Sequence, residues 1–181
     1  MGDNGNNGKN QRTAIIGGTF NALHDGHKYY IKLAFDYAEE VYILLTSDDY
    51  AKISKSYQVN SYKFRKKCLE DYVLEIKRAR QCHIINMDSD CFLINFCLKN
   101  DFTMAILIPE YYPLFQKINR IREDEGKNPL LLLVTQRIKT REGFKLSSTL
   151  INNLKCDHRI SPTQYSPDLA AYTESPKYSF N

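Results

Sequence analysis

The stretch Gly17-Gly-Thr-Phe-Asn-Ala-Leu-His24-Asp-Gly-His27 carries the residue types best suited to chemistry in this chain of 181 residues. Its two histidines stand three positions apart, so at the start of a helix they share one face. A helix N-terminus offers free N–H groups and a partial positive charge, and both favour phosphate. Imidazoles placed there can donate hydrogen bonds to a phosphoryl oxygen that gains charge during a reaction. The stretch therefore predicts a phosphate site.

A zinc site and a plain helix cap are the alternatives for the two histidines. Zinc takes about four ligands, whereas His83 and His158 stand alone, without cysteines at a matching spacing. The five cysteines are odd in number and include no C-x-x-C pair. That pattern predicts free, mostly buried thiols in a reducing compartment. Phosphate binding is the interpretation that the complete stretch favours.

A second group of hydroxyls stands far downstream, in Lys145-Leu-Ser147-Ser148-Thr149. Serine and threonine are favoured first residues of helices, and a helix start rich in hydroxyls and N–H groups suits the β- and γ-phosphates of a nucleotide. Alone, the triplet would be typical of any helix cap. Together with the histidine stretch, it predicts a triphosphate site built from two helix starts.

Strand-like and helix-like segments alternate around these motifs and must bring them together. Short apolar runs predict buried strands, and apolar residues at i, i+3, i+4 and i+7 predict helices. The alternation indicates an α/β fold with a doubly wound parallel sheet, whose ligands bind at the carboxyl ends of the strands. The expected strands are 13–17, 41–46, 83–86, 104–108 and 130–135; the expected helices contain 31–38, 69–76 and 114–121, the last ended by Gly126, and a short helix starts at Ser147.

The composition fits one domain between two tails. Hydrophobic residues make up 43% of the chain and charged residues 25%, which excludes wholesale disorder. No apolar run approaches the roughly 20 residues of a membrane span, and no secretory signal is recognisable. We expect a cytoplasmic protein without a membrane partner. The expected organisation is a disordered tail over 1–11, a domain over 12–156, and a flexible tail with three Ser-Pro steps over 157–181.

The net charge of +4 suits a domain that handles anionic ligands but is low for a dedicated nucleic-acid binder. Bases outnumber acids between Lys63 and Arg80. We interpret this helix as a solvated face from which Arg65 reaches the substrate, rather than as a nucleic-acid surface.

The histidine stretch resembles the H-x-G-H signature of the superfamily of adenylyl- and cytidylyltransferases, and Ser147-Ser148-Thr149 resembles the second signature of that superfamily. Within it, the chain is similar to the archaeal and eukaryotic type of phosphopantetheine adenylyltransferase from about residue 13 to 153. Departures are Leu150 where a basic residue is usual, Asn21-Ala22 for Asp-Pro, and Ser61 for proline. The similarity rests on Leu45-Thr-Ser-Asp-Asp-Tyr-Ala-Lys52, Tyr62-Lys-Phe-Arg65-Lys-Lys-Cys-Leu69, and the block holding Ile108-Pro-Glu110, Lys117-Ile-Asn119-Arg-Ile-Arg122 and Glu125-Gly126.

The resemblance implies a Rossmann-like nucleotidyltransferase that joins ATP and 4′-phosphopantetheine, giving dephospho-coenzyme A and pyrophosphate. It implies that His27 stabilises the α-phosphate, His24 binds the nucleotide phosphates and Thr19 orients the attacking phosphate. Lys52, preferred here over Lys55, would bridge the two substrates. Mg²⁺ is expected to arrive with ATP, held by phosphate and water, so no protein metal site is predicted. A homo-oligomer is compatible with the sequence. Further nucleotide contacts are expected from Gly18, Phe20, Gly26, Glu110, Arg122, Ser147, Ser148 and Thr149.

Three other functions stay open. Another H-x-G-H enzyme, such as a nicotinamide mononucleotide adenylyltransferase or a glycerol- or choline-phosphate cytidylyltransferase, shares the triphosphate chemistry. Arg141-Glu-Gly-Phe144 partly matches the R-T-E-G-I-S-T-T ending of the cytidylyltransferases. A catalytically silent nucleotide-binding subunit is a rival of a different class, although the intact Thr19, His24 and His27 argue against it. A nucleic-acid-binding module is the third alternative.

Overall fold

The computed structural model describes residues 11–55 and 57–135. Most of both predicted tails, and the predicted helix that begins at Ser147, lie outside these residues. The boundaries of the domain therefore stay a prediction.

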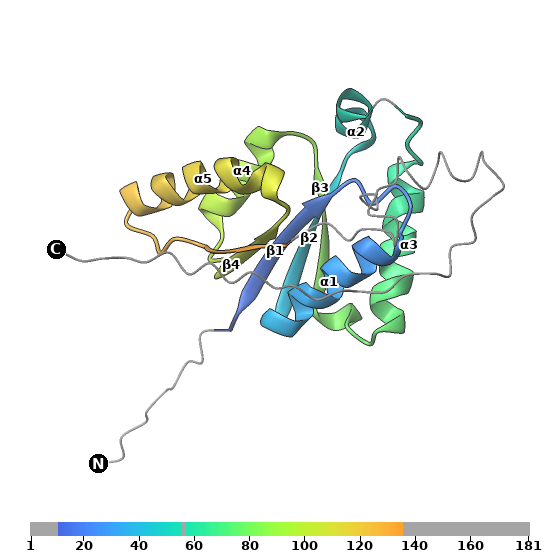
Figure 1. Ribbon diagram of the computed structural model, residues 1–181, viewed down its shortest axis with the longest axis horizontal. Helices are drawn as coiled ribbons and strands as arrows, with labels where there is room; N and C mark the ends of the chain where they lie inside the picture. The colour runs from blue at the N-terminus through green and yellow to red at the C-terminus, as the bar shows by residue number, and fades with distance from the viewer. Residues whose placement is uncertain (1–10, 56, 136–181) are drawn as a thin grey trace, which may run out of the picture.

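One parallel sheet of five strands forms the centre of the molecule, in the order β3-β2-β1-β4-β5 (Figure 1). Each strand coincides with an apolar run of the sequence, as expected for a sheet buried on both faces. The prediction of a doubly wound α/β fold is confirmed. The strands are β1 (Thr13–Gly18), β2 (Glu40–Thr46), β3 (Cys82–Met87), β4 (Met104–Leu107) and β5 (Leu131–Val134).

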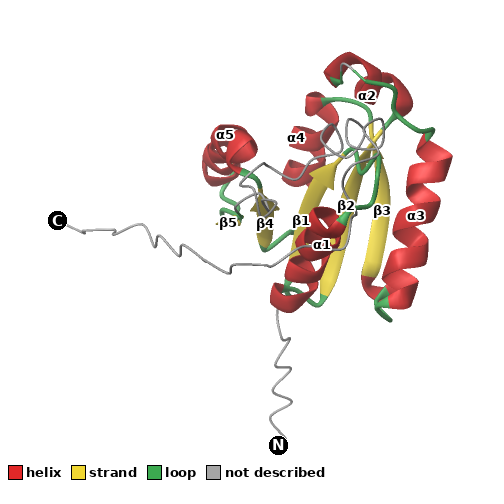
Figure 2. Cartoon of the chain, turned by 45° about the vertical axis from the view of Figure 1, so that its right-hand side comes forward, coloured by secondary structure: helices red, strands yellow, loops and turns green. Residues whose placement is uncertain are grey.

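Helices cover the two faces of the sheet (Figure 2). Side chains alternate between the faces along each strand, so Ile16 and Ile43 pack with α1 and α3, whereas Ile15 and Leu44 pack with α4 and α5. Helices α2 and α4 were not predicted from the sequence. The helices are α1 (Asp25–Tyr37), α2 (Asp48–Ser54), α3 (Tyr62–Glu75), α4 (Asp90–Lys99) and α5 (Tyr112–Asp124), with short 3₁₀ turns η1 (Ala79–Gln81) and η2 (Pro109–Tyr111).

A single residue explains where α5 ends, and another explains where α3 begins. Gly126 has a φ of 73° and its N–H donates to the Glu123 carbonyl, while Lys127 N–H donates to Arg122. This is the glycine-ended helix stop predicted for α5. At the start of α3, the Ser61 hydroxyl accepts from Phe64 N–H, so serine caps this helix.

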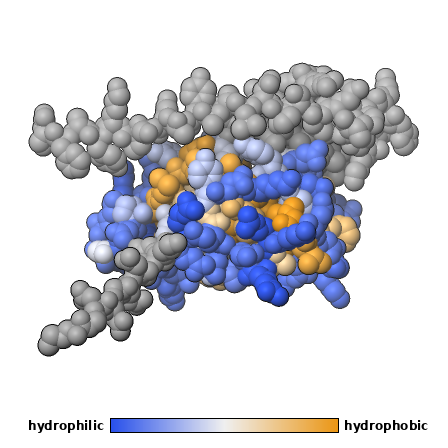
Figure 3. Space-filling view, turned by 90° about the horizontal axis from the view of Figure 1, so that it is seen from below, coloured by the Kyte–Doolittle hydropathy of each residue, from blue (hydrophilic) through white to orange (hydrophobic). Residues whose placement is uncertain are grey.

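The face drawn in Figure 3 is mainly hydrophilic, with smaller hydrophobic areas. On α3 the lysines at positions 66 and 67 pair with Glu70 and Asp71, one turn further along, as expected for a solvated face. The four cysteines in the described ranges are unpaired, and of these only Cys97 is fully buried. In the same ranges, none of the helices has the length and apolar character needed to cross a membrane.

Candidate active site

The strand order reverses between β1 and β4, and this is where doubly wound sheets bind ligands. These two strands pair only at Ala14–Met104 and Ile15–Ala105. Beyond those pairs lies a crevice, lined in part by Gly18, Tyr30 and Tyr111. The Tyr30 hydroxyl donates to the Ile106 carbonyl at the crevice. Because burial raises the pKa of Tyr30, the hydroxyl stays a neutral donor.

The two histidines of the H-x-G-H motif stand together at the start of α1. His24 is the N-cap, and its Nδ1 accepts from His27 N–H at 3.4 Å. The two rings stack with centroids 3.8 Å apart, which confirms that they share one face. Gly26 lies between them in the first helical turn, where backbone N–H groups are free of helical partners.

The hydrogen-bond partners of the two rings assign a different tautomer to each. His24 Nδ1 accepts, so the proton of the neutral ring sits on Nε2. That atom is buried and has no hydrogen-bond partner among the described residues. His27 Nδ1 lies 2.8 Å from the Ala22 carbonyl and donates to it, which leaves Nε2 of the neutral ring with a lone pair.

Both imidazoles are neutral at pH 7. Burial lowers the pKa of His24 to about 4, against a smaller opposing effect of Asp25. The pKa of His27 is lowered to about 3, mainly by burial and then by the nearby His24 and the Lys55 charge, while the bond to Ala22 opposes these effects. An anion bound at these rings would favour the protonated form and raise both pKa values.

The turn between β1 and α1 packs against the His27 ring through Phe20. Phe20 has a φ of 48° and is 2% exposed, and its ring centroid lies 4.9 Å from that of His27. A Cβ added at Gly18 would lie 3.0 Å from Phe20 Cε2, so only glycine fits there without a shift. Thr19 stands between these two residues, at the carboxyl end of β1.

The two candidate lysines follow β2, Lys52 within α2 and Lys55 at its C-cap. Lys52 is 72% exposed and pairs with Asp49 at 3.3 Å. Lys55, at the end of α2, is partly buried and close enough to His27 to lower its pKa. Of the two lysines, Lys55 is the one whose charge lowers the pKa of His27, and which of them bridges the substrates stays a prediction.

Glu110 lies in η2, directly after β4, and so sits at the predicted edge of the sheet. Ser147, Ser148 and Thr149 lie outside the described residues. In the ranges that are described, no three His, Cys, Asp or Glu side chains group closely enough to hold a metal ion.

Arg122 is not placed to bind phosphate, and the expectation of a nucleotide contact there is wrong. Its side chain is 2% exposed, and its guanidinium donates to the carbonyls of Asn128, Cys97, Asn100 and Phe102. Asn100 and Phe102 precede β4, so this arginine lies at the amino edge of the sheet, opposite the histidines. Arg122 lies four residues after the buried Ile118, so both side chains are on the buried face of α5.

Arg65 is likewise fully buried, instead of reaching a substrate from a solvated face. Its guanidinium bonds to the Thr19 carbonyl and to Asp48. The sequence carried a signal for this, because Arg65, Leu69, Tyr72 and Val73 share the buried spacing of α3.

Comparison with known proteins agrees with this geometry. Residues 15–154 match the cytidylyltransferase-like family. The chain is 37% identical to the phosphopantetheine adenylyltransferase of Methanosarcina acetivorans, over 75% of this chain and 86% of that protein. It is also 37% identical to the one of Pyrococcus abyssi, over 77% and 88%. A crystal structure of a protein of unknown function from Archaeoglobus fulgidus superposes with a TM-score of 0.59 at 29% identity, covering 68% of this chain and 88% of that one.

Fold, site and matches together define a nucleotidyltransferase. More narrowly, the chain belongs to the cytidylyltransferase-like family, and its relatives there include archaeal phosphopantetheine adenylyltransferases.

Proposed function

We propose that this chain transfers the adenylyl group of ATP to 4′-phosphopantetheine, giving dephospho-coenzyme A and pyrophosphate. The observation that carries the proposal is the stacked pair of neutral histidines at the start of α1, beside the crevice between β1 and β4. The relatives named as phosphopantetheine adenylyltransferases supply the choice of substrates.

The reaction needs positioning and charge stabilisation rather than a covalent intermediate on the protein. An oxygen of the acceptor phosphate attacks the α-phosphorus of ATP in line. The bond from that phosphorus to the oxygen bridging to the β-phosphate breaks, and this oxygen leaves as part of pyrophosphate.

The geometry supports a distinct role for each histidine. His24 donates its Nε2 proton to a phosphate oxygen, which supplies the buried nitrogen with the partner that it lacks within the described residues. His27 donates to the α-phosphate only after taking up a proton from solvent at Nε2, because its Nδ1 proton is held by Ala22. The negative charge that develops on the α-phosphate favours that uptake.

The remaining roles are part of the same proposal. Thr19 orients the acceptor phosphate, with Gly18, Phe20 and Gly26 giving the phosphates room and N–H donors. Lys55, whose charge lowers the pKa of His27, bridges the acceptor and the α-phosphate, and Lys52 is the alternative for this role. Glu110 serves the ribose or adenine end of ATP, and Ser147, Ser148 and Thr149 complete the proposal at the triphosphate end.

Mg²⁺ would enter as the ATP complex, held by phosphate oxygens and water. When bound, it neutralises charge on the triphosphate.

We further propose a domain over residues 12–156 flanked by tails, acting in the cytoplasm, where unpaired cysteines persist. We propose no nucleic-acid partner, because lysines of α3 are engaged with acids on the same helix.

The acceptor and donor can be tested together by measuring pyrophosphate release. ATP or CTP would be combined with 4′-phosphopantetheine, nicotinamide mononucleotide or choline phosphate, each with Mg²⁺. The proposal expects release with ATP and 4′-phosphopantetheine, and at least a hundredfold less with the other pairs. Preference for CTP would instead support a cytidylyltransferase, which the family match over 15–154 makes the second candidate. Binding of ATP without release from any pair would support the silent subunit.

A further inference from the structure

Arg65 joins three segments that meet at the carboxyl edge of the sheet. Its Nη1 donates to the Thr19 carbonyl at 2.9 Å and lies 3.4 Å from Thr46 Oγ1, at the end of β2. Its Nε donates to the Asn60 carbonyl at 2.8 Å. Its Nη2 pairs with Asp48 at 2.9 Å. A side chain that is 0% exposed thus connects the loop before α1, the entry to α2 and the entry to α3.

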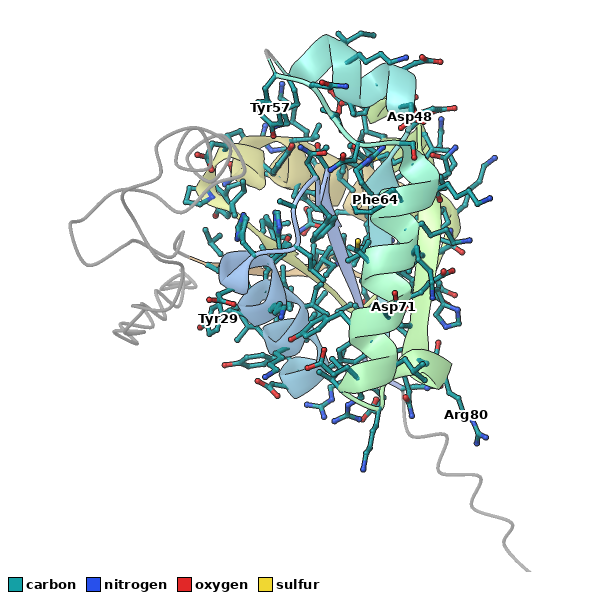
Figure 4. All side chains as sticks on the ribbon, turned by 90° about the vertical axis from the view of Figure 1, so that its right-hand side faces the viewer. Tyr29, Asp48, Tyr57, Phe64, Asp71 and Arg80 are labelled. Atoms are coloured by element: carbon teal, nitrogen blue, oxygen red, sulfur yellow. The ribbon has the colours of Figure 1, made fainter. Side chains whose placement is uncertain are left out.

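Asp48 forms a second contact with α3, besides its ion pair with Arg65. Its Oδ1 also accepts from Tyr62 N–H at 2.6 Å, so one carboxylate oxygen holds both the backbone and the arginine of the first turn of α3. Figure 4 shows Asp48 at the same end of α3 as Phe64, with Asp71 further along the helix. The sequence motifs around Thr46-Ser-Asp48 and Tyr62-x-x-Arg65 are therefore the two halves of one hydrogen-bonded unit.

A second set of hydrogen bonds joins the same two loops. The side chain of Asn21, 4% exposed, accepts from Asn60 N–H at 2.6 Å, and Asn60 Nδ2 donates to the Asn21 carbonyl at 3.0 Å. Asn60, directly before the cap of α3, is thereby held against the loop between β1 and α1. The charge of Lys55, at the end of α2, lowers the pKa of His27.

The bond from Arg65 to the Thr19 carbonyl also fixes the direction of the Phe20 N–H. In a trans peptide the carbonyl and the following N–H point in opposite directions. Arg65 holds the Thr19 carbonyl toward the interior, so the N–H of Phe20 points the other way, at the end of β1 where the acceptor phosphate is proposed to sit. The left-handed φ of Phe20, 48°, is thus held by a buried charge-assisted bond.

We propose that Arg65 is a positioning residue, which fixes the Thr19–Phe20 peptide as a hydrogen-bond donor for the acceptor phosphate. This inference rests on the proposed function. It predicts a split between two properties: ATP binding depends on the histidine pair and α1, whereas the transfer step depends on the peptide that Arg65 holds.

The experiment compares Arg65 with Arg122 in the full chain. Both arginines are buried and both bond to backbone carbonyls, but Arg122 lies at the far edge of the sheet. We would make Arg65→Gln, Arg65→Lys, Arg122→Gln and Arg122→Lys. For each variant, the fraction folded, the Kd for Mg·ATP, and kcat and KM for 4′-phosphopantetheine would be measured.

For Arg65→Gln we expect a roughly hundredfold loss in kcat/KM for 4′-phosphopantetheine per folded molecule, since a misplacement of about 1 Å can cost that much. The Kd for Mg·ATP should change less than about threefold, Arg65→Lys should recover part of the rate, and both Arg122 variants should turn over normally once corrected for unfolding. Equal losses in the two glutamine variants, or parallel losses of ATP affinity and turnover in Arg65→Gln, would show a merely structural role and overturn the inference. A wild-type chain that makes no dephospho-coenzyme A would overturn the proposed function instead.

Discussion

Replacing His24 with asparagine separates the two roles that the structure gives this side chain. Asparagine is among the best N-cap residues, so it can take over the bond to His27 N–H, which is already long at 3.4 Å. It cannot supply the Nε2 proton, which is buried and has no partner among the described residues. The cap is kept and the phosphate donor is lost.

The two consequences differ in size. Losing one preorganised donor should lower kcat by roughly 10²–10³-fold, or about 3–4 kcal/mol of transition-state stabilisation. Asparagine brings two N–H donors of its own, so the substitution does not relieve an unpaired polar group. Because the cap is kept, the free energy of unfolding should stay close to that of the wild type.

The assay is kcat with saturating Mg·ATP and 4′-phosphopantetheine, alongside thermal unfolding of the same samples. His83→Asn is the control, because His83 lies on the edge strand β3 beside Glu40 and should leave turnover unchanged. Turnover of His24→Asn within threefold of the wild type would refute the assignment of Nε2 as a phosphate donor.

Three further predictions concern charge and backbone. His27 has a pKa of about 3 in the folded protein against an ordinary 6.5, so below pH 6.5 the unfolded chain binds a proton that the folded protein does not. The share of stability that depends on His27 should fall between about pH 6.5 and 3, by up to about 1.4 kcal/mol per pH unit. His24, with a pKa of about 4, adds a share of its own, so His27→Gln should reduce the slope in denaturant titrations without removing it, and an unchanged slope would contradict the burial argument. Lys55→Ala should lower kcat/KM roughly a hundredfold and Lys52→Ala should not; the reverse order would restore Lys52 as the bridging residue. Gly126→Ala should cost about 1 kcal/mol from the left-handed backbone alone, because nothing lies within 4 Å of the added Cβ; an unchanged Tm would count against that backbone conformation.

The apolar runs and the i, i+3, i+4 spacings predicted all five strands and three of the helices because each buries a single stripe or a continuous run. Helix α4 was missed since its apolar residues face several directions: Leu93 and Cys97 are buried, and Phe92, Ile94 and Phe96 pack partly against the same cluster. A sequence that is apolar nearly all round shows no helical period.

The site was predictable where local spacing decides the geometry and not where tertiary contacts do. Two histidines three apart had to share a face, and they do. Whether an arginine on an amphipathic helix faces solvent or backbone carbonyls depends on which element packs against it. For Arg65 and Arg122 those partners, Thr19 and Cys97, come from distant parts of the chain. Similarly, the position of Lys55 relative to His27 depends on where α2 ends.

The central claim is that the histidine pair catalyses transfer of AMP to 4′-phosphopantetheine. The most direct test quantifies dephospho-coenzyme A and pyrophosphate in one reaction of Mg·ATP with 4′-phosphopantetheine, for the wild type and for His27→Ala. The account predicts equal amounts of the two products, formed at least roughly a hundredfold more slowly by the variant. Pyrophosphate without dephospho-coenzyme A, or a variant as fast as the wild type, would contradict it.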